Sequence, residues 1–335
     1  RNKPATGLLK IDSISTTQDV QDSSGTNLAN STIVWNDSAN ANYREQFTAV
    51  LNAANQTGQL FGKPRESAKI GGIDTEVYTL SSNQLDLPIF KFQTGVGGTN
   101  RAFEVVPSTI NGSDSIYEST PVPGTGLTYT YRSDGSGDSS NNTGFFFLFK
   151  QGTMESEDFT VNTSITNYIK SVPTTNINDT DVYLYRLDQF GQLAELWTKV
   201  PSLSGNNAIY NSLSKSERNT YNVVTKNNDA IDLVFGDGNF SNIPLGSFRT
   251  YYRTSDNAKY AIQPADMQGV QLSVPYTDAN GAQQSLSISL SLKASIYNSA
   301  ATESNDSIKE KAAQVYYSQN RMITAEDYQV VPLSA

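Results

Sequence analysis

Short apolar runs recur along the chain between clusters of glycine, asparagine, aspartate and proline. The runs are rich in β-branched and aromatic residues, a composition that is typical of strands. They occupy residues 76–80, 87–92, 102–106, 127–131, 145–149, 181–187 and 193–199. Many short strands separated by turn residues predict antiparallel sheets arranged as sandwiches or barrels.

The clearest alternation lies in residues 285–292, where leucine or isoleucine occupies every second position and serine fills the positions between. Because successive side chains of a strand point to opposite faces, this pattern predicts a strand with one buried face and one hydroxylated face. Asn280-Gly281, just upstream, is a typical hairpin turn. We therefore expect residues 270–276 to form the partner strand.

Helical patterns are few. Residues 40–55 carry apolar side chains at helical spacing, and so do residues 307–318. Thr324, with Asp327 three positions later, resembles an N-cap and predicts a third helix that runs toward residue 331.

Together these patterns predict a β-rich α+β fold with several domains: antiparallel, sandwich-like sheets, a few helices and a helical segment at the C-terminus. We expect an N-terminal segment with one amphipathic helix (residues 1–75), a β-rich domain (76–205), and a region of strands followed by helices (206–335). Polar stretches at residues 133–142 and 204–220 are candidate linkers.

The composition narrows the possible chemistry. The 335 residues include neither cysteine nor histidine, and 33 acidic residues outnumber 24 basic ones, giving a net charge of -9. The absence of cysteine and histidine excludes thiolate nucleophiles, disulfides, catalytic imidazoles and His- or Cys-bearing zinc sites. We therefore expect no cofactor. The acidic balance disfavours a nucleic-acid partner. No apolar run approaches the roughly 18 residues of a membrane helix, so we expect no membrane partner either.

Three short motifs resemble known sites but lack essential residues. Residues 134–138 begin like a calcium loop, yet Phe145 stands where the bidentate glutamate belongs, so a flexible hairpin tip is the expected alternative. Residues 95–98 lack the third glycine of a dinucleotide loop and indicate a turn. Residues 212–215 and 255–257 match two of the three motifs of penicillin-recognising serine enzymes, but Lys-Thr-Gly is absent.

Carboxylates are the one catalytic apparatus that this composition leaves open. Glu155, Glu157 and Asp158 lie close in sequence, and paired acids perform glycoside hydrolysis. A solvated acidic turn is the simpler interpretation. A carboxylate glycosidase therefore stays as a minor alternative.

Two segments in the last third of the chain carry a resemblance to a known family. The first is a Gly-Asp-Gly turn between two strands, the second of them aromatic, and its residues are Phe235, Gly236, Asp237, Gly238, Pro244, Gly246, Tyr252 and Arg253. The second belongs to the C-terminal helical region, and its residues are Tyr316, Tyr317, Asn320, Arg321, Thr324, Asp327 and Tyr328. In this order, over about residues 230–328, the two segments resemble the baseplate J-like family of contractile phage tails.

The large members of this family are baseplate wedge subunits, and the asparagine- and serine-rich surroundings resemble the C-terminal part of the T-even type. The resemblance implies a structural, non-enzymatic role in the tail baseplate of a virion that is assembled in the host cytoplasm. The implied role is to join neighbouring wedges into a ring around the hub and to relay the change that triggers sheath contraction. The implied partners are other wedge subunits, the sheath-initiating subunit and a second copy of the chain.

We expect a homodimer, with Tyr316, Tyr317 and Tyr328 as candidate interface residues and ordinary core packing as their alternative role. The first residues, Arg1-Asn2, include no initiator methionine, and we expect the chain to be a piece of a longer protein. A second interpretation, from the Ser-, Thr-, Asn- and Tyr-rich β region, is a tail-associated adhesin or receptor-binding module, which we would expect to be a trimer.

Overall fold

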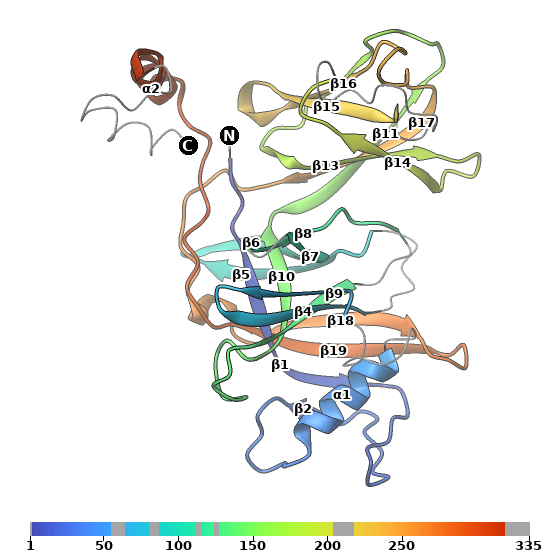
Figure 1. The fold of residues 1–335 in the computed structure, drawn as a ribbon, viewed down its shortest axis with the longest axis vertical. Coiled ribbons are helices and arrows are strands. Elements are labelled where there is room, and N and C mark those ends of the chain that lie inside the picture. Colours follow the sequence, from blue (N-terminus) through green and yellow to red (C-terminus); the bar gives the residue numbers. More distant parts are fainter. Residues whose placement is uncertain are drawn as a thin grey trace.

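The computed structural model describes residues 2–54, 64–80, 87–111, 115–123, 127–203 and 218–318. The fold is strand-rich with antiparallel sheets, as predicted, and the described residues include two α-helices. Figure 1 shows two lobes stacked along the long axis. We call them lobe A (residues 2–152 and 256–300) and lobe B (residues 153–255).

Lobe A is built on one large sheet in the order β18-β19-β1-β10-β9-β4-β3, with β2 beside β1 and the β5–β6 hairpin attached to β10. Its strands are β1 (Thr6–Thr16), β2 (Ile33–Val34), β3 (Glu66–Ile70), β4 (Ile73–Leu80), β5 (Phe90–Val96), β6 (Thr99–Val106), β9 (Leu127–Ser133), β10 (Gly144–Gln151), β18 (Val270–Thr277) and β19 (Gln283–Leu292). The hairpin of β7 (Ser108–Asn111) and β8 (Ser115–Glu118) forms a small sheet of its own, and helix α1 (Tyr43–Ala54) packs on lobe A. A 3-10 turn, η4 (Pro264–Met267), precedes β18.

Strand β10 lies at the centre of lobe A because both of its faces are buried. Phe145 stacks on Phe47 of α1, with ring centroids 5.5 Å apart, and meets the edge of Trp35 at 5.4 Å. The next side chain, Phe146, points to the opposite face and is also buried. A strand that is covered on both faces has a continuous apolar sequence, which explains the unbroken run at residues 145–149.

Lobe B is a single seven-stranded sheet in the order β11-β17-β13-β14-β15-β16-β12. Its elements are β11 (Thr153–Val161), β12 (Ile169–Val172), β13 (Ile177–Leu187), β14 (Leu193–Lys199), β15 (Thr220–Thr225), the 3-10 turn η3 (Asn227–Asp229), β16 (Ile231–Phe235) and β17 (Gly246–Thr254). The edge strands β11 and β12 face each other, because Lys170 Nζ lies 2.5 Å from Glu157 Oε1 and over the Phe159 ring. The sheet thus curls around an aromatic core of Trp197, Phe235 and Phe248.

The order of the strands shows that lobe B is inserted between β10 and β18 of lobe A. Strand β1 pairs with both β10 and β19, so lobe A is assembled from two distant parts of the chain. The lobes do not coincide with the expected segments 1–75, 76–205 and 206–335, because residues 76–205 contribute strands to both sheets. Hydrophobic periodicity is local and does not show which distant strands pair.

Several expected elements are present. The helix expected at residues 40–55 is α1, the one expected at 307–318 lies within α2 (Asn305–Ser318), and the predicted hairpin is β18–β19, with Gly281 at φ 82° in its turn. The third helix, expected to begin at Thr324, lies outside the described residues.

The linker expected at residues 133–142 is instead a connection within lobe A, between β9 and β10. Asp134 accepts hydrogen bonds from Ser140 Oγ (2.5 Å) and Ser136 N (2.9 Å), and the Ser140 hydrogen bond is the largest cause that lowers the pKa of Asp134 to about 2. Lys10 Nζ donates to the Ser140 carbonyl at 2.7 Å. These contacts hold the loop against the sheet, so it is not a linker but the loop of the β9–β10 hairpin, in agreement with the hairpin expected as the alternative to a calcium loop. Most of the other expected linker, 204–220, lies outside the described residues.

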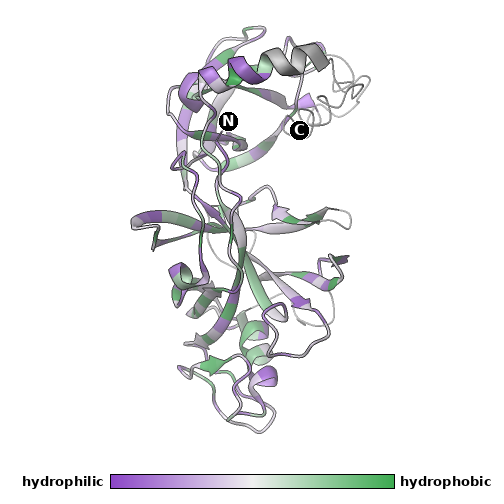
Figure 2. Ribbon diagram, turned by 90° about the vertical axis from the view of Figure 1, so that its left-hand side faces the viewer, coloured by the Kyte–Doolittle hydropathy of each residue, from purple (hydrophilic) through white to green (hydrophobic). Residues whose placement is uncertain are grey.

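The first and last described segments run together along the molecule. Lys3 and Ala300 exchange backbone hydrogen bonds at 2.8 and 2.9 Å. Asn2 Nδ2 donates to Asp229 Oδ2 of lobe B at 3.0 Å, and Thr302 Oγ1 donates to the same oxygen. Figure 2 shows these segments passing beside both lobes, and in Figures 1 and 2 helix α2 lies at the level of lobe B. Lobe B is therefore attached to lobe A at Asp229 as well as through its own two connections.

We predict that Gly152→Ala lowers the free energy of unfolding by about 1–3 kcal/mol or more. Gly152 lies where the chain first passes from lobe A to lobe B, and its φ is 123°. A Cβ there would lie 2.3 Å from the carbonyl oxygen of Thr254, the last residue of β17 before the chain returns to lobe A. Urea denaturation measures the loss. Gly95→Ala in β5 is the control, because a Cβ there meets nothing within 4 Å, and it should change stability by less than about 1 kcal/mol. Equal effects at the two positions would contradict the steric account.

Candidate functional site at the lobe junction

A buried group of charged side chains lies where the two lobes meet, and Arg253 of β17 is at its centre. Its side chain is 0% exposed. Nε lies 3.0 Å from Glu104 Oε2, Nη1 lies 2.7 Å from Asp181 Oδ2, and the two terminal nitrogens bind both oxygens of Glu118 at 2.8 and 3.0 Å. One guanidinium therefore binds three carboxylates from three strands.

A second cation completes the group, which we call the junction cluster (Glu104, Glu118, Lys150, Asp181 and Arg253). Lys150 Nζ lies 2.6 Å from Asp181 Oδ1 and 2.9 Å from Glu118 Oε2. Strands β6, β8 and β10 of lobe A supply Glu104, Glu118 and Lys150, whereas β13 and β17 of lobe B supply Asp181 and Arg253. The junction cluster therefore joins the lobes.

The aromatic strand β17 positions Arg253 through its alternation. Phe248 and Tyr252 pack in the lobe B core, so Tyr251 and Arg253 lie on the other face, toward lobe A. Tyr251 packs there with Leu87 of lobe A in a small apolar contact beside the charges.

Burial and pairing set the pKa values of the junction cluster. Burial raises the pKa of Glu104, and Arg253 offsets only part of this effect. Burial would also raise the pKa of Asp181, but attraction to Arg253 and Lys150 outweighs it and leaves that pKa well below its usual value. Burial opposes the charge of Arg253, yet Glu118 and Asp181 hold its pKa well above its usual value.

Asp181 and Glu104 change the pH dependence of the free energy of unfolding in opposite directions. The stabilising effect of the depressed pKa of Asp181 is present above the unfolded value of about 3.9 and is lost as pH falls through the folded-state pKa. The effect of the raised pKa of Glu104 is present below the unfolded value of about 4.3 and is lost as pH rises through the folded-state pKa.

A cavity of 380 Å³ adjoins the junction cluster. Glu118 and Thr120 of lobe A line one side, and Tyr183, Trp197 and Lys199 of lobe B line the other. The cavity therefore lies between the lobes, with one acid of the junction cluster in its wall.

A second, more polar cavity of 850 Å³ lies between the loops of lobe B and the segment that leads to α2. Asn176, Asn228, Asp229 and Asn257 line it, and each has a left-handed backbone with φ between 50° and 59°. Asparagine and aspartate tolerate this conformation better than other residues that carry a Cβ. These residues shape the place where the terminal segments attach.

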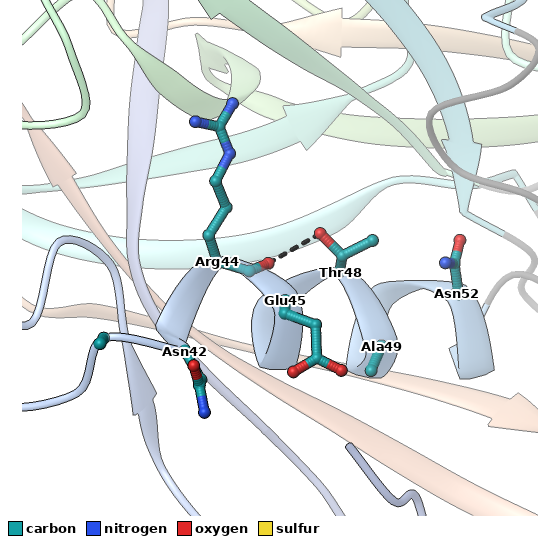
Figure 3. Close-up of a pocket in the computed structure, with 7 residues that line it drawn as sticks. Asn42, Arg44, Glu45, Thr48, Ala49 and Asn52 are labelled. Atoms are coloured by element: carbon teal, nitrogen blue, oxygen red, sulfur yellow. Dashed lines mark hydrogen bonds between the residues drawn. The ribbon is translucent and has the colours of Figure 1, made fainter. Parts of the chain in front are cut away.

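A third hollow, of 620 Å³, runs along the outward side of α1, and Figure 3 shows its residues. Arg44 and Glu45 point in opposite directions there. Arg44 Nη2 donates to the Tyr131 hydroxyl at 2.6 Å, and Glu45 Oε1 accepts from the Ser23 amide at 2.7 Å. Both charged groups thus hold α1 to other parts of lobe A rather than forming an acid–base pair.

In the first segment that resembles the baseplate J-like family, backbone conformation or close packing requires glycine at three positions. A Cβ on Gly236 would lie 2.3 Å from the Ser241 Cβ, whereas Gly238 and Gly246 have φ of 90° and 106°. Of the expected Gly-Asp-Gly turn, only Gly238 therefore needs a positive φ, and Gly236 needs space.

The other residues of the first segment divide between core and surface. Phe235, Pro244, Tyr252 and Arg253 are buried within the chain, so they stabilise this fold and are not available as surface contacts. Asp237 is partly exposed and accepts hydrogen bonds from the Asn239 backbone and side chain.

Most of the second segment that resembles the baseplate J-like family lies outside the described residues. Tyr316 and Tyr317 belong to α2, but their side chains lie outside the described set. The remaining residues of that segment lie outside the described residues altogether, and they are Asn320, Arg321, Thr324, Asp327 and Tyr328.

The acidic stretch proposed as a catalytic alternative is part of strand β11 rather than a solvated turn. Glu157 and Asp158 are consecutive, so they point to opposite faces, where they pair with Lys170 and Arg249. Glu155 accepts a hydrogen bond from Thr254 Oγ1. Each of the three acids thus has a partner within the sheet.

The other short motifs have structural roles where they are described. Residues 95–98 include the β5–β6 turn, with Gly97 and Gly98 at positive φ. Residues 255–257 follow β17, and Asp256 pairs there with Arg101. Residues 212–215 lie outside the described residues.

Four members of the junction cluster were not predicted from the sequence: Glu104, Glu118, Lys150 and Asp181. The sequence does carry a signal for two of them, Glu104 and Lys150. Glu104 is the one charged residue in the apolar run 102–106, and Lys150 directly follows the run 145–149. A single charge next to buried apolar positions indicates a paired buried charge, because an unpaired one is too costly to bury.

Comparison with known families places both lobes in one unit. The family described as "Domain of unknown function (DUF8360)" matches residues 7–295, most of the chain. The chain belongs to this family. The match begins in β1 and ends just after β19, so the DUF8360 unit includes both lobes and the junction cluster. No curated protein and no solved structure matches the chain.

Neither a metal centre nor a membrane-spanning helix is found among the described residues. No group of three or more acidic side chains there is arranged to hold a metal ion. No described helix combines the length and the apolar character needed to cross a membrane.

We predict that Arg253→Met destabilises the protein by about 3–5 kcal/mol, because it leaves three buried carboxylates with one cation. Arg249→Met on the same strand is the matched control. Arg249 pairs with Asp158, whose side chain is 53% exposed, so the loss there should be below about 1 kcal/mol. Chemical denaturation of both variants measures the difference, and similar losses would show that the junction cluster contributes no more than a surface pair.

We also predict that Glu104→Gln alters the pH dependence of stability. The variant cannot ionise at this position, so its stability relative to the unsubstituted chain should increase as pH rises from about 4 to 7. Urea denaturation at three pH values across this range measures the trend. A stability difference that does not change with pH would mean that Glu104 titrates as an ordinary glutamate.

Proposed function

We propose that the chain is a structural subunit of a contractile phage tail baseplate, in which it joins neighbouring wedges into a ring and relays the rearrangement that triggers sheath contraction. The observation that supports this proposal most directly is the structural role of the first segment that resembles the baseplate J-like family. Gly236, Gly238 and Gly246 set its backbone, and Arg253 joins the lobes. The residues that carry the resemblance thus build and connect a two-lobed body.

The connection between the lobes suits a subunit that transmits force. Two chain crossings, the junction cluster and the contacts at Asp229 link lobe A to lobe B. Because packed interfaces deform little, a displacement of one lobe is passed to the other. A relay between neighbouring subunits requires this property.

One end of lobe B offers apolar side chains for contact with another subunit. Ile165, Phe190 and Leu245 are 47%, 76% and 50% exposed. Their loops lie at the same end of the sheet, because Val161 pairs with Gly246 and Arg186 pairs with Phe248. Exposed apolar groups that gather on neighbouring loops favour protein–protein contact.

Immunoelectron microscopy tests the proposal. Antibodies against this chain should label the baseplate end of contractile tails in virions of the phage that encodes it. Label on the tips of tail fibres would instead favour the adhesin alternative. Complete absence of the chain from purified virions would contradict the structural role.

Sedimentation tests the expected homodimer. The chain should sediment as a dimer over a wide concentration range, and Tyr317→Asp should weaken the dimer at least tenfold. Val34→Asp, at an exposed position of lobe A, is the matched control and should leave the dimer intact. A monomer at all concentrations would contradict self-association through this chain, and a stable trimer would favour the receptor-binding alternative.

A further inference from the structure

The lobe B sheet curls around its core without closing, which leaves a seam between β11 and β12. Residues 162–168 join these consecutive strands, yet the two stand at opposite ends of the strand order and do not pair with each other. Side chains span the seam instead: Lys170 Nζ lies 2.5 Å from Glu157 Oε1 and 5.7 Å from the centre of the Phe159 ring. The sheet therefore has two free edges that face each other.

The free edge of β11 can be assigned to particular residues. Met154 pairs with β17, but its N–H donates to Glu104 Oε1 at 2.7 Å, so this N–H points away from β17. In an antiparallel strand the N–H and C=O of one residue point to the same side, and successive residues alternate. The backbone groups of Ser156, Asp158 and Thr160 therefore point to the free edge as well.

The same reasoning assigns the facing edge of β12. The Phe235 N–H of β16 donates to the Tyr168 carbonyl at 3.0 Å, so the backbone of Tyr168 points toward β16. The next residue points the other way, and the alternation continues along the strand. Ile169 and Ser171 therefore turn their backbone groups toward the seam.

The backbone groups that face the seam have no hydrogen-bond partner within the described part of the chain, and their residues are Ser156, Asp158, Thr160, Ile169 and Ser171. All five residues are exposed, so another molecule can reach them. An extended polypeptide presents N–H and C=O groups in the matching alternation, at a strand spacing of about 4.8 Å. The backbone of the seam thus selects a peptide strand over a sugar, a lipid or a nucleic acid.

The acids of β11 decide which kind of strand fits. Pairing with the same strand of a second copy would set Glu155, Glu157 and Asp158 against their own copies, and like charges opposite each other are destabilising. Lys170 and Arg249 pair with the last two acids, whereas the exposed Glu155 forms no ion pair with a described residue. The edge therefore favours a strand that brings positive charge.

We propose that the β11 edge of this seam binds an extended, basic segment of another polypeptide, which adds to the lobe B sheet as a strand. Its backbone bonds to the outward groups of β11, and its lysine or arginine side chains lie beside Glu155. Ile169 adjoins Lys170 and so lies on the other face, where its 54% exposed side chain contacts apolar groups of the added strand. The proposal does not rest on the baseplate role, and its failure would leave that role untouched.

Hydrogen exchange of backbone amides tests the proposal with a capped heptapeptide, Thr-Lys-Val-Lys-Thr-Lys-Val, whose lysines share one face of a strand. Saturating peptide should slow the exchange of the Ser156, Asp158 and Thr160 amides about tenfold or more, measured by NMR. The amides of Glu157 and Phe159 point toward β17 and should change little. If millimolar heptapeptide slows exchange at none of the three edge amides, the proposal is overturned.

Two further peptides separate the contributions of charge and backbone. Glutamate in place of every lysine should weaken binding about tenfold or more, because like charges then meet along β11. Proline in place of the third and fourth residues removes an N–H from each edge of the peptide and should abolish binding. Equal binding of all three peptides would show a contact without strand pairing and would overturn the proposal.

Matched variants locate the bound strand. Glu155→Lys should weaken binding of the lysine peptide about tenfold. Asp74→Lys, at a 72% exposed position of β4 in lobe A, makes the same change in net charge and should leave binding unchanged. Equal weakening by the two variants would assign the binding to net charge alone and overturn the proposal.

The exchange data also identify the competing occupants. Slowed exchange along β3 or β18 instead of β11 would place the peptide on another edge. Slowed exchange of the three edge amides at high protein concentration without peptide would show that two copies pair there. Either result would overturn the proposal.

Discussion

The arrangement of the two lobes depends on one guanidinium with no contact with water. Arg253 binds Glu104, Glu118 and Asp181, and its planar fork meets Glu118 with two nitrogens at once. Arginine suits this position because it keeps its charge when buried and donates in fixed directions. Taking these charges out of water is costly, so the junction cluster is better understood as a device that fixes one arrangement of the lobes than as a source of net stability.

The topology of the chain makes such a device necessary. Lobe B is inserted between β10 and β18, so only two connections tie it covalently to lobe A, and they run side by side at Gly152 and Thr254. The apolar contact around Tyr251 is small. The directional hydrogen bonds that Arg253 donates, together with those that Asp229 accepts from the terminal segments, define an orientation that two adjacent connections alone would leave free. A rigid two-lobed body is what the proposed relay in a baseplate requires.

Local features of this fold could be predicted from the sequence, and long-range ones could not. The serine–leucine alternation predicted β19 and its hairpin with β18, because a period of two is a property of the strand itself. Strand β1 was missed: Lys10 and a bulge between Ile11 and Ser13 interrupt its alternation. The junction cluster was missed for a deeper reason, since its five residues come from five strands in two lobes and meet only through the topology. Arg253 was singled out through its family resemblance, but its partners were not.

Differential scanning calorimetry tests the central claim, that the junction cluster makes the two lobes one cooperative unit. The account predicts a single transition for the unsubstituted chain, with a calorimetric enthalpy equal to the van't Hoff enthalpy. Replacement of Arg253 by methionine should divide it into two transitions, one for each lobe. Two separate transitions in the unsubstituted chain would contradict the account, because they would show that the lobes unfold independently although the junction cluster is present.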